Sequence, residues 1–294
     1  MPESLLDKDF VARLEYLYVV TRELFAGHAA AERLSKKFGV GVEFADYRTY
    51  TAGDDFRYID WSAFARRDEL LIKLFSEAQA ARIYIVVDAS NSMGVGTPEK
   101  LLFAKKIAAA LAYVSLANLD PVTMLVFDQS LRPLSRVFQG RAQLQPMLAF
   151  LDDVRPDGTG TGMGTAFRQF VQRFHGGGLV ILLSDFFDRT GYEEAIRLLV
   201  YHHFGLVALQ VNDREEVEPS FNGDLELVDS ETGERKVVQM TPKLRQTYAE
   251  TFEQHYGELA RLCKVQQRTH IPVITDTPFE EMIFEVFRRR GILK

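Results

Sequence analysis

Residues Ile83-Tyr84-Ile85-Val86-Val87-Asp88 form a continuous apolar run that ends in an acid. Such a run is typical of a strand buried on both faces, which is the pattern of a parallel sheet. Leu179-Val180-Ile181-Leu182-Leu183-Ser184-Asp185 repeats the pattern later in the chain. The sequence therefore predicts two buried strands that each end at a carboxylate.

Strand-like runs alternate with helical periodicity from about residue 80 to the C-terminus. The further strands are expected at residues 122–127, 205–211 and 271–275, with an antiparallel edge at 131–138. The expected helices lie between them, at residues 97–115, 141–151, 163–174, 192–200 and 242–267, and a last one follows Thr277. This alternation predicts an α/β fold, an open and mainly parallel sheet with helices on both faces.

Two regions are expected to differ in organisation. Residues 1–79 form an N-terminal extension, with a helix at about 7–25 followed by a polar segment that contains short β pieces. Residues 80–294 form the sheet domain. An exposed hairpin is inserted near residues 222–240, around the turn Ser230-Glu231-Thr232-Gly233-Glu234.

Composition excludes several classes of protein. The 294 residues carry 35 Lys+Arg against 41 Asp+Glu, a net charge of -6, and no long basic run, so no nucleic-acid partner is expected. The single cysteine, Cys263, excludes an intramolecular disulfide and a cysteine-based zinc site. No stretch is apolar enough to cross a membrane, and the acidic N-terminus lacks a signal core. A cytoplasmic location is expected.

Oxygen donors follow the two strands that end in acids. Asp88-x-Ser90-x-Ser92 places a carboxylate and two hydroxyls on one turn, and Asp185 adds a second carboxylate. The glycine-rich loop at residues 158–162 adds a threonine hydroxyl. Ligands of such folds bind beyond the carboxyl ends of the strands, and hard divalent cations prefer oxygen ligands. Two carboxylates balance the charge of one Mg²⁺, so the sequence predicts a magnesium site.

This pattern resembles the metal-ion-dependent adhesion site of von Willebrand factor A domains. The matching residues, all expected to be metal ligands, are Asp88, Ser90, Ser92, Thr161 and Asp185. Thr159 is the alternative to Thr161, which is preferred because a helix begins directly after it. The resemblance implies a von Willebrand A-like sheet and Mg²⁺ as cofactor, with Mn²⁺ or Ca²⁺ as alternatives.

Further motifs resemble family 58 of the domains of unknown function. They include Arg48-x-Tyr50, Gly53-Asp54-Asp55-x-Arg57-x-Ile59-Asp60-Trp61, Ser184-Asp185-Phe186 and Asp229-x-Glu231-Thr232-Gly233. Many members of that family carry N-terminal membrane helices, whereas this chain is expected to resemble the short soluble type. The resemblance implies a metal-dependent protein-interaction module that is a partner or adaptor of a MoxR-type AAA+ ATPase in protein remodelling.

Two functional hypotheses follow, and the first is not an enzyme. In it the metal accepts an Asp or Glu side chain from the ATPase or from a client protein, and the hairpin acids Asp229 and Glu231 are remote from the site. The alternative is a magnesium-dependent phosphatase resembling the haloacid dehalogenase family. That family places a second Asp two residues after its nucleophile as general acid, whereas this chain has Ser90 there.

Overall fold

The structure of the protein is a computed structural model. The structure describes residues 5–17, 42–51, 54, 59–61, 63–64, 69–77, 82–97, 99–117, 119–133, 136–156, 160 and 162–289. The chain divides into two compact units. One comprises Met1–Arg22 with Ala81–Lys294, and the other comprises Glu23–Ala80.

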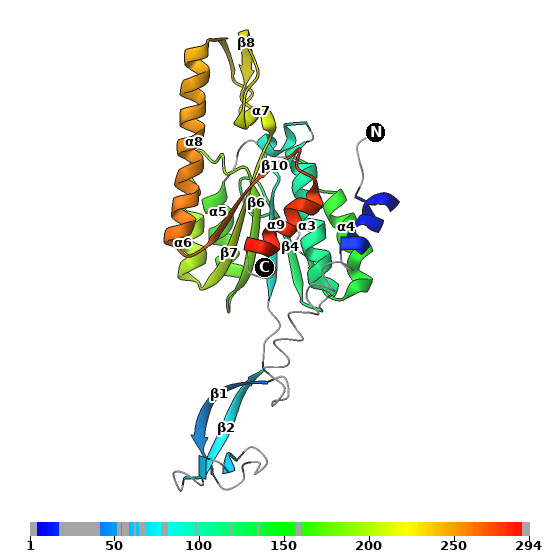
Figure 1. The fold of residues 1–294 in the computed structure, drawn as a ribbon, viewed down its shortest axis with the longest axis vertical. Helices are drawn as coiled ribbons and strands as arrows, with labels where there is room; N and C mark the ends of the chain where they lie inside the picture. The colour runs from blue at the N-terminus through cyan, green and yellow to red at the C-terminus, as the bar shows by residue number, and fades with distance from the viewer. Residues whose placement is uncertain are drawn as a thin grey trace. The chain divides into compact units, whose positions relative to one another are not determined.

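The first unit is built on a six-stranded sheet with the strand order β10-β7-β6-β3-β4-β5 (Figure 1). The strands are β3 (Ile83–Asp88), β4 (Val122–Phe127), β5 (Arg136–Phe138), β6 (Gly178–Ser184), β7 (Phe204–Asn212) and β10 (Thr269–Ile274). Five run parallel, and β5 pairs with β4 antiparallel at one edge. The predicted mainly parallel α/β fold is confirmed, including its antiparallel edge.

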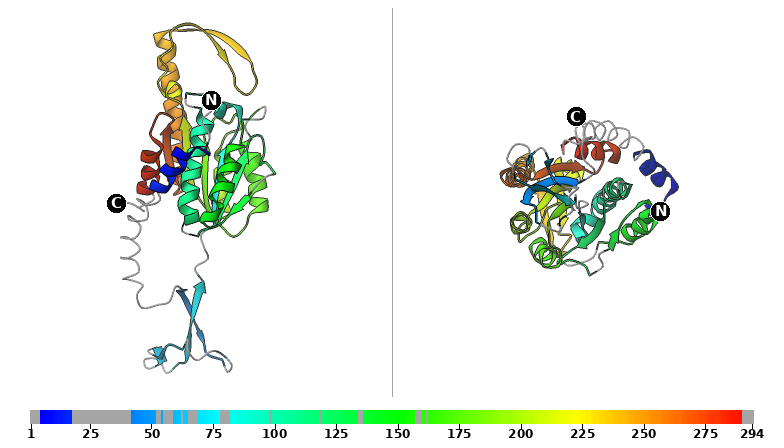
Figure 2. Two further views of the ribbon diagram at one scale, coloured as in Figure 1. Left: turned by 90° about the vertical axis from the view of Figure 1, so that its right-hand side faces the viewer. Right: turned by 90° about the horizontal axis from the view of Figure 1, so that it is seen from below.

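Helices cover both faces of this sheet, as the view from below in Figure 2 shows. One face carries α3 (Lys100–Ala117), α4 (Leu144–Asp152) and α9 (Phe279–Arg289), and the other carries α5 (Met163–Arg173), α6 (Glu193–Tyr201) and α8 (Pro242–Val265). The residues of β3 and β4 are all buried because both faces are covered, which explains their unbroken apolar runs.

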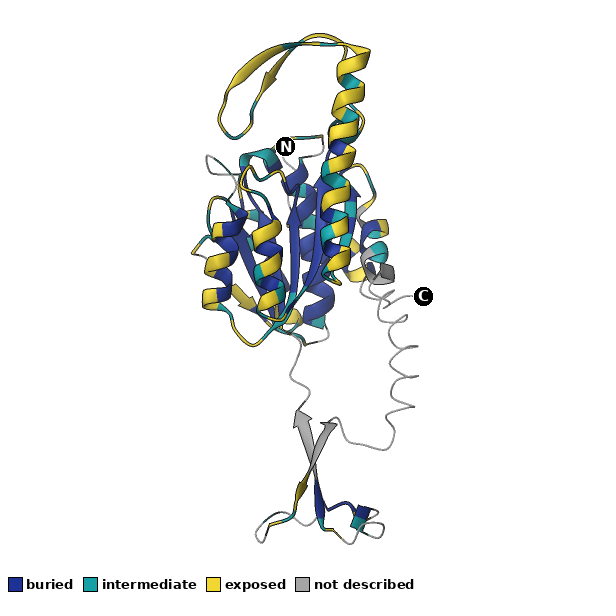
Figure 3. Ribbon diagram, turned by 90° about the vertical axis from the view of Figure 1, so that its left-hand side faces the viewer, coloured by how far each residue is buried: buried dark blue, intermediate teal, exposed yellow. Residues whose placement is uncertain are grey.

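Helix α8 contributes its C-terminal half to the core. Leu259 and Cys263 are fully buried in a cluster with residues of α5, α6 and the central strands. Burial raises the pKa of the Cys263 thiol to about 11. The N-terminal half of α8 extends past the edge of the sheet and is largely exposed (Figure 3).

A two-stranded hairpin precedes α8. Its strands are β8 (Gly223–Val228) and β9 (Arg235–Met240), and the short helix α7 (Arg214–Val217) leads into it. Most of its residues are exposed, as predicted for an inserted hairpin. Figures 2 and 3 show it bending back over the edge of the sheet where the strands β3 and β6 end.

The helix at residues 8–17 packs on the sheet unit. Leu14 and Leu17 are buried, and Arg13 Nε donates to Glu280 Oε1 of α9 at 2.6 Å. The Leu5 amide donates to Asp152 Oδ1 at the end of α4 at 3.1 Å. These contacts explain why the structure groups residues 1–22 with the sheet, whereas the sequence assigned them to the extension. The rest of the helix expected at 7–25 lies outside the described residues.

The second unit contains the antiparallel pair β1 (Val42–Thr49) and β2 (Leu71–Glu77). Arg48 forms an ion pair with Asp54 at 2.8 Å, and the Trp61 ring meets Phe64 edge-on. Hydrogen bonds from Arg48 and Thr51 hold the pKa of Asp54 at about 2. Much of the polar cluster that the sequence singled out here lies outside the described residues. No helix in the described part of the chain is long and apolar enough to span a membrane.

Candidate functional site

The strand order reverses between β3 and β6. Chain progression runs outward from β3 to β4 and β5 on one side, and from β6 to β7 and β10 on the other. Such a switch point opens a crevice at the carboxyl ends of the two strands, where open α/β sheets bind ligands. Asp88 ends β3 and Asp185 directly follows β6, and both are fully buried. The fold therefore brings the two acids that the sequence singled out to one place.

Asp88 is held by two hydrogen bonds. Its Oδ1 accepts from the Ser90 amide at 2.9 Å, and its Oδ2 accepts from Ser184 Oγ at 2.6 Å. Burial and the negative charge of Asp185 raise the pKa of Asp88 to about 7. Both effects disfavour an isolated carboxylate, so the position is one where a cation would stabilise the charged form.

The two predicted serine ligands lie on the turn after β3. Ser90 Oγ and Ser92 Oγ are 3.1 Å apart, at the start of the 3₁₀ turn η2 (Asn91–Gly94). Asp88, Ser90 and Ser92 thus form one cluster, as their spacing predicts. Thr161 and its alternative Thr159 lie outside the described residues.

Lys100 is a buried residue of this region that sequence reasoning missed. Its Nζ donates to Asp185 Oδ2 at 2.8 Å and to Glu216 Oε1 at 2.5 Å. Burial alone would lower the pKa of Lys100, but the charges of Asp185 and Glu216 raise it above its usual value. The sequence-based charge balance of two carboxylates against one Mg²⁺ omitted this ammonium, which already neutralises part of the Asp185 charge.

Glu216 also belongs to a capping box at the start of α7. The Asp213 amide donates to Glu216 Oε2 at 2.8 Å, while Asp213 accepts from the first turn of α7. Asp213 Oδ2 accepts from the Thr97 amide at 2.9 Å, just before α3. The segment after β7 is therefore tied to the start of α3 through Lys100, Glu216 and Asp213.

The hairpin reaches the site, contrary to the prediction that its acids are remote. Glu231 Oε1 accepts from the Ser92 amide at 2.7 Å, and Asp229 pairs with Arg189 at 2.5 Å. The hairpin strands themselves are exposed, but its turn meets the loops after β3 and β6. Glu231 Oε2 is buried and has no hydrogen-bond donor among the described residues.

This donor set suits a hard divalent cation. Two hydrogen-bonded groups meet here: Asp88 and Glu231 are bound to the Ser90–Ser92 turn, whereas Asp185 and Glu216 are bound to Lys100. No group of three or more His, Cys, Asp or Glu in the described residues is arranged to hold a metal, so serine hydroxyls would have to complete the shell. Mg²⁺ accepts one or two carboxylates and retains waters, which fits this arrangement.

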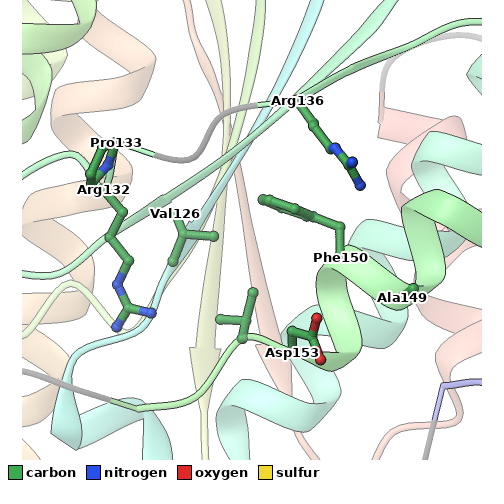
Figure 4. A pocket seen from close by; sticks show the side chains of 8 residues that line it. Val126, Arg132, Pro133, Arg136, Ala149, Phe150 and Asp153 are labelled. Carbon is green, nitrogen blue, oxygen red and sulfur yellow. The ribbon is translucent and has the colours of Figure 1, made fainter.

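A separate cavity of about 440 Å³ lies between the loop after β4 and the end of α4. Figure 4 shows Arg132, Arg136 and Asp153 at its margin, around the apolar side chains of Val126 and Phe150. Arg132 is paired with Asp128 at 2.9 Å. The lining offers no pair of acids and no nucleophile with a base, so the strand-end cluster is the better candidate for a functional site.

Comparison with known families identifies the family of the chain. The family model described as "Protein of unknown function DUF58" matches residues 46–258. The chain belongs to the DUF58 family. The matched region spans both acidic strand ends and the hairpin turn.

Relatives of this DUF58 chain match along almost its whole length. An uncharacterized protein of Mycobacterium bovis and one of Mycobacterium tuberculosis are each 25% identical to it over 293 residues. Each alignment covers 98% of this chain and 92% of the relative.

Among solved structures, the conserved hypothetical protein BatB from Bacteroides thetaiotaomicron is similar to the DUF58 chain with a TM-score of 0.46 and 17% identity. That match covers 72% of this chain and 99% of BatB. An aerotolerance-related membrane protein from Bacteroides fragilis gives a TM-score of 0.43 and 16% identity, over 72% of this chain and 100% of the other.

Proposed function

We propose that this protein is a metal-dependent protein-interaction module that uses a von Willebrand A-like adhesion site. The observation that carries the proposal is the cluster of buried Asp88 and Ser90 with half-buried Ser92 at the switch point of the sheet. Asp88, Ser90, Ser92 and Asp185 would hold Mg²⁺, with Thr161 as the fifth ligand that the sequence predicts. When bound, the ion would supply an open position for an external carboxylate.

The cluster favours binding over hydrolysis. A phosphatase of the haloacid dehalogenase kind needs a general acid two residues after its nucleophile, and Ser90 cannot serve near neutral pH. The buried ammonium of Lys100 is already paired with Asp185 and Glu216. In the proposal, the site therefore positions a cation and leaves substrates chemically unchanged.

The partner is proposed from the family resemblance and from charge. Resemblance to DUF58 proteins suggests a MoxR-type AAA+ ATPase or its client, and a metal with an open position favours an Asp or Glu from that partner. Losing one member of a buried interfacial charge pair costs about 2–5 kcal/mol. Binding of the ATPase should therefore weaken strongly in EDTA and in Asp88→Ala.

The metal is tested by thermal unfolding with and without Mg²⁺ or Mn²⁺. A ligand that binds only the folded state stabilises it by RT ln(1 + [L]/Kd), about 1.4 kcal/mol at tenfold excess over Kd. We expect a rise in Tm for the wild type and for Asp224→Ala, an exposed hairpin acid. Asp88→Ala should stay folded and show no rise.

Equal Tm shifts in the wild type and Asp88→Ala would remove Asp88 from the site. Hydrolysis of an aryl phosphate that depends on Mg²⁺ and on Asp88 would instead favour the phosphatase alternative. Pull-down of the ATPase that is insensitive to both EDTA and Asp88→Ala would place the contact elsewhere.

A further inference from the structure

We propose that Glu231 is the carboxylate that this chain itself supplies to the open position of the metal, so that the hairpin covers the site until an acidic partner displaces it. The inference rests on the proposed function, because it needs a cation at Asp88. It assigns a role to the hairpin and states what a partner has to compete with.

The first argument is the position of the Glu231 side chain. Its Oε1 accepts from the Ser92 amide at 2.7 Å, and Ser92 Oγ lies 3.1 Å from Ser90 Oγ. Glu231 is thus bound to the loop that carries two of the proposed ligands. Its second oxygen, Oε2, is buried without a donor among the described residues. A buried carboxylate oxygen without a partner is costly, and a cation next to it removes that cost.

The second argument is charge. Asp88 and Glu231 both meet the loop at Ser90 and Ser92, through their hydrogen bonds to its amides. Lys100 is directed to Asp185 and Glu216, so it does not pair with either of these two acids in the described structure. A divalent cation bound at this loop would attract both carboxylates.

The third argument is that the hairpin tip, residues 229–233, is prebuilt to present Glu231. Asp229 Oδ1 accepts from the amides of Glu231 at 2.9 Å and Thr232 at 2.8 Å, and the Gly233 amide donates to the Asp229 carbonyl at 2.8 Å. Arg189, in the loop after β6, fixes the other oxygen of Asp229. A side chain that is already oriented binds with little further loss of conformational freedom.

The fourth argument is that the hairpin can be released. It has two strands, and residues such as Val228 and Val237 are 54% and 75% exposed. A two-stranded hairpin is marginally stable by itself, so the contacts of its tip decide whether it stays docked. A tethered carboxylate acts at an effective concentration of the order of millimolar, which a partner must exceed to replace it. A partner would therefore need a higher affinity for the metal to displace the hairpin.

The experiment compares the full-length wild type with Glu231→Gln, Glu231→Ala, Glu234→Gln and Asp88→Ala. Glu234 is the matched control, an exposed glutamate three residues along on the same turn. Mg²⁺ and Mn²⁺ affinity is measured by calorimetry, and protection of residues 225–238 is measured by hydrogen exchange with and without Mg²⁺. Coupling between two sites is reciprocal, so a metal that binds more tightly through Glu231 must also hold the hairpin more tightly.

We expect Mg²⁺ to slow hydrogen exchange in the hairpin of the wild type and of Glu234→Gln. Glu231→Gln should bind Mg²⁺ at least about tenfold more weakly, the loss typical of removing a group that supports a metal site. Its hairpin exchange should not respond to Mg²⁺. Water-proton relaxation gives an independent readout, because Mn²⁺ bound to Glu231→Ala should carry one more exchangeable water than Mn²⁺ bound to the wild type.

The outcomes separate the two proposals. Equal Mg²⁺ affinity in the wild type and Glu231→Gln, with hairpin exchange unaffected by the metal, would overturn the role of Glu231 and leave the metal site standing. A wild type that binds neither Mg²⁺ nor Mn²⁺ would overturn the metal-dependent function, and the role of Glu231 with it. An unchanged number of Mn²⁺-bound waters in Glu231→Ala would also contradict direct ligation.

Discussion

Lys100 is the buried cation that pairs with two of the acids at the strand ends. Its ammonium is almost completely buried, at 1% exposure, and lies between Asp185 and Glu216. Removing one member of a buried ion pair lowers stability by more than the intact pair contributes to it, because the remaining charge stays buried without a partner. Lys100 is therefore as much a part of the site's architecture as the acids that the sequence motif contains.

We expect Lys100→Met to lower the free energy of unfolding by about 3–5 kcal/mol, because it leaves the carboxylates of Asp185 and Glu216 without their cation. Urea unfolding monitored by circular dichroism would measure the loss, with Lys243→Met on the exposed face of α8 as control. Saturating Mg²⁺ should recover part of it in the variant. A loss no larger than that of the control would show that the buried pair contributes little.

Individual site residues differ in how visible they are in the sequence. Asp88, Ser90 and Ser92 share one turn after an apolar run, so their spacing alone brings them together. Lys100 lies in a helical pattern, where a lysine normally indicates a solvent-exposed position. Glu231 contacts Ser92 across 139 residues of sequence, and no local pattern predicts such a contact.

At the scale of elements, strands and long helices were predictable because burial imposes period and length. The apolar runs predicted β3, β4 and β6 almost to the residue. Helix α7 was missed because its four residues, Arg214–Val217, are too few to show helical periodicity. The hairpin strands were predicted to within a few residues. The part of the protein that the hairpin contacts was not predicted, because the pairing of its two strands does not determine the direction in which the hairpin points.

A Gly→Ala substitution should have opposite effects on stability at two positions, one at the start of a strand and one inside a helix. Gly178 begins β6 at φ 136°, and a Cβ there would lie 2.7 Å from the Arg82 carbonyl oxygen and 2.8 Å from the Tyr84 ring. Gly257 lies in the middle of α8, with open space around the position of a Cβ. We expect Gly178→Ala to destabilise the protein by about 1–3 kcal/mol and Gly257→Ala to stabilise it by about 0.5–1 kcal/mol.

Thermal unfolding of the two glycine variants checks this contrast, because the same chemical change is made in both. Equal Tm values for Gly178→Ala and the wild type would mean that the start of β6 can move away from Arg82 at little cost. That result would contradict the close approach of β6 to the residues just before β3.

At the scale of the whole chain, a helix from the beginning of the sequence packs against the sheet unit. The segment at residues 8–17 is anchored by buried leucines and by the pair between Arg13 and Glu280 of α9. Hydrophobic periodicity predicted this helix, but not the partner on which it packs, because several helices offer comparable apolar faces. The structure thus moves the first residues from the extension to the sheet.

We expect Leu14→Ala to lower the stability of the sheet unit by about 2–5 kcal/mol, as fully buried leucines do when truncated. Leu14 has 0% exposure, whereas Tyr16 on the same helix is 68% exposed, so Tyr16→Ala is the matched control, with a change within about 0.5 kcal/mol. Chemical denaturation measures both. A Leu14→Ala variant as stable as the control would show that the helix contributes nothing to the sheet unit.

The buried Cys263 makes this protein suited to site-specific labelling. It is the single cysteine of the chain, it has 0% exposure, and its raised pKa keeps the thiol protonated near neutral pH. Thiol reagents act on the thiolate, so the native chain should remain unmodified under mild conditions. A cysteine introduced at Val237 on the hairpin would then be the sole reactive thiol. A fluorophore or spin label there could report each departure of the hairpin from the Ser90–Ser92 turn in the intact protein.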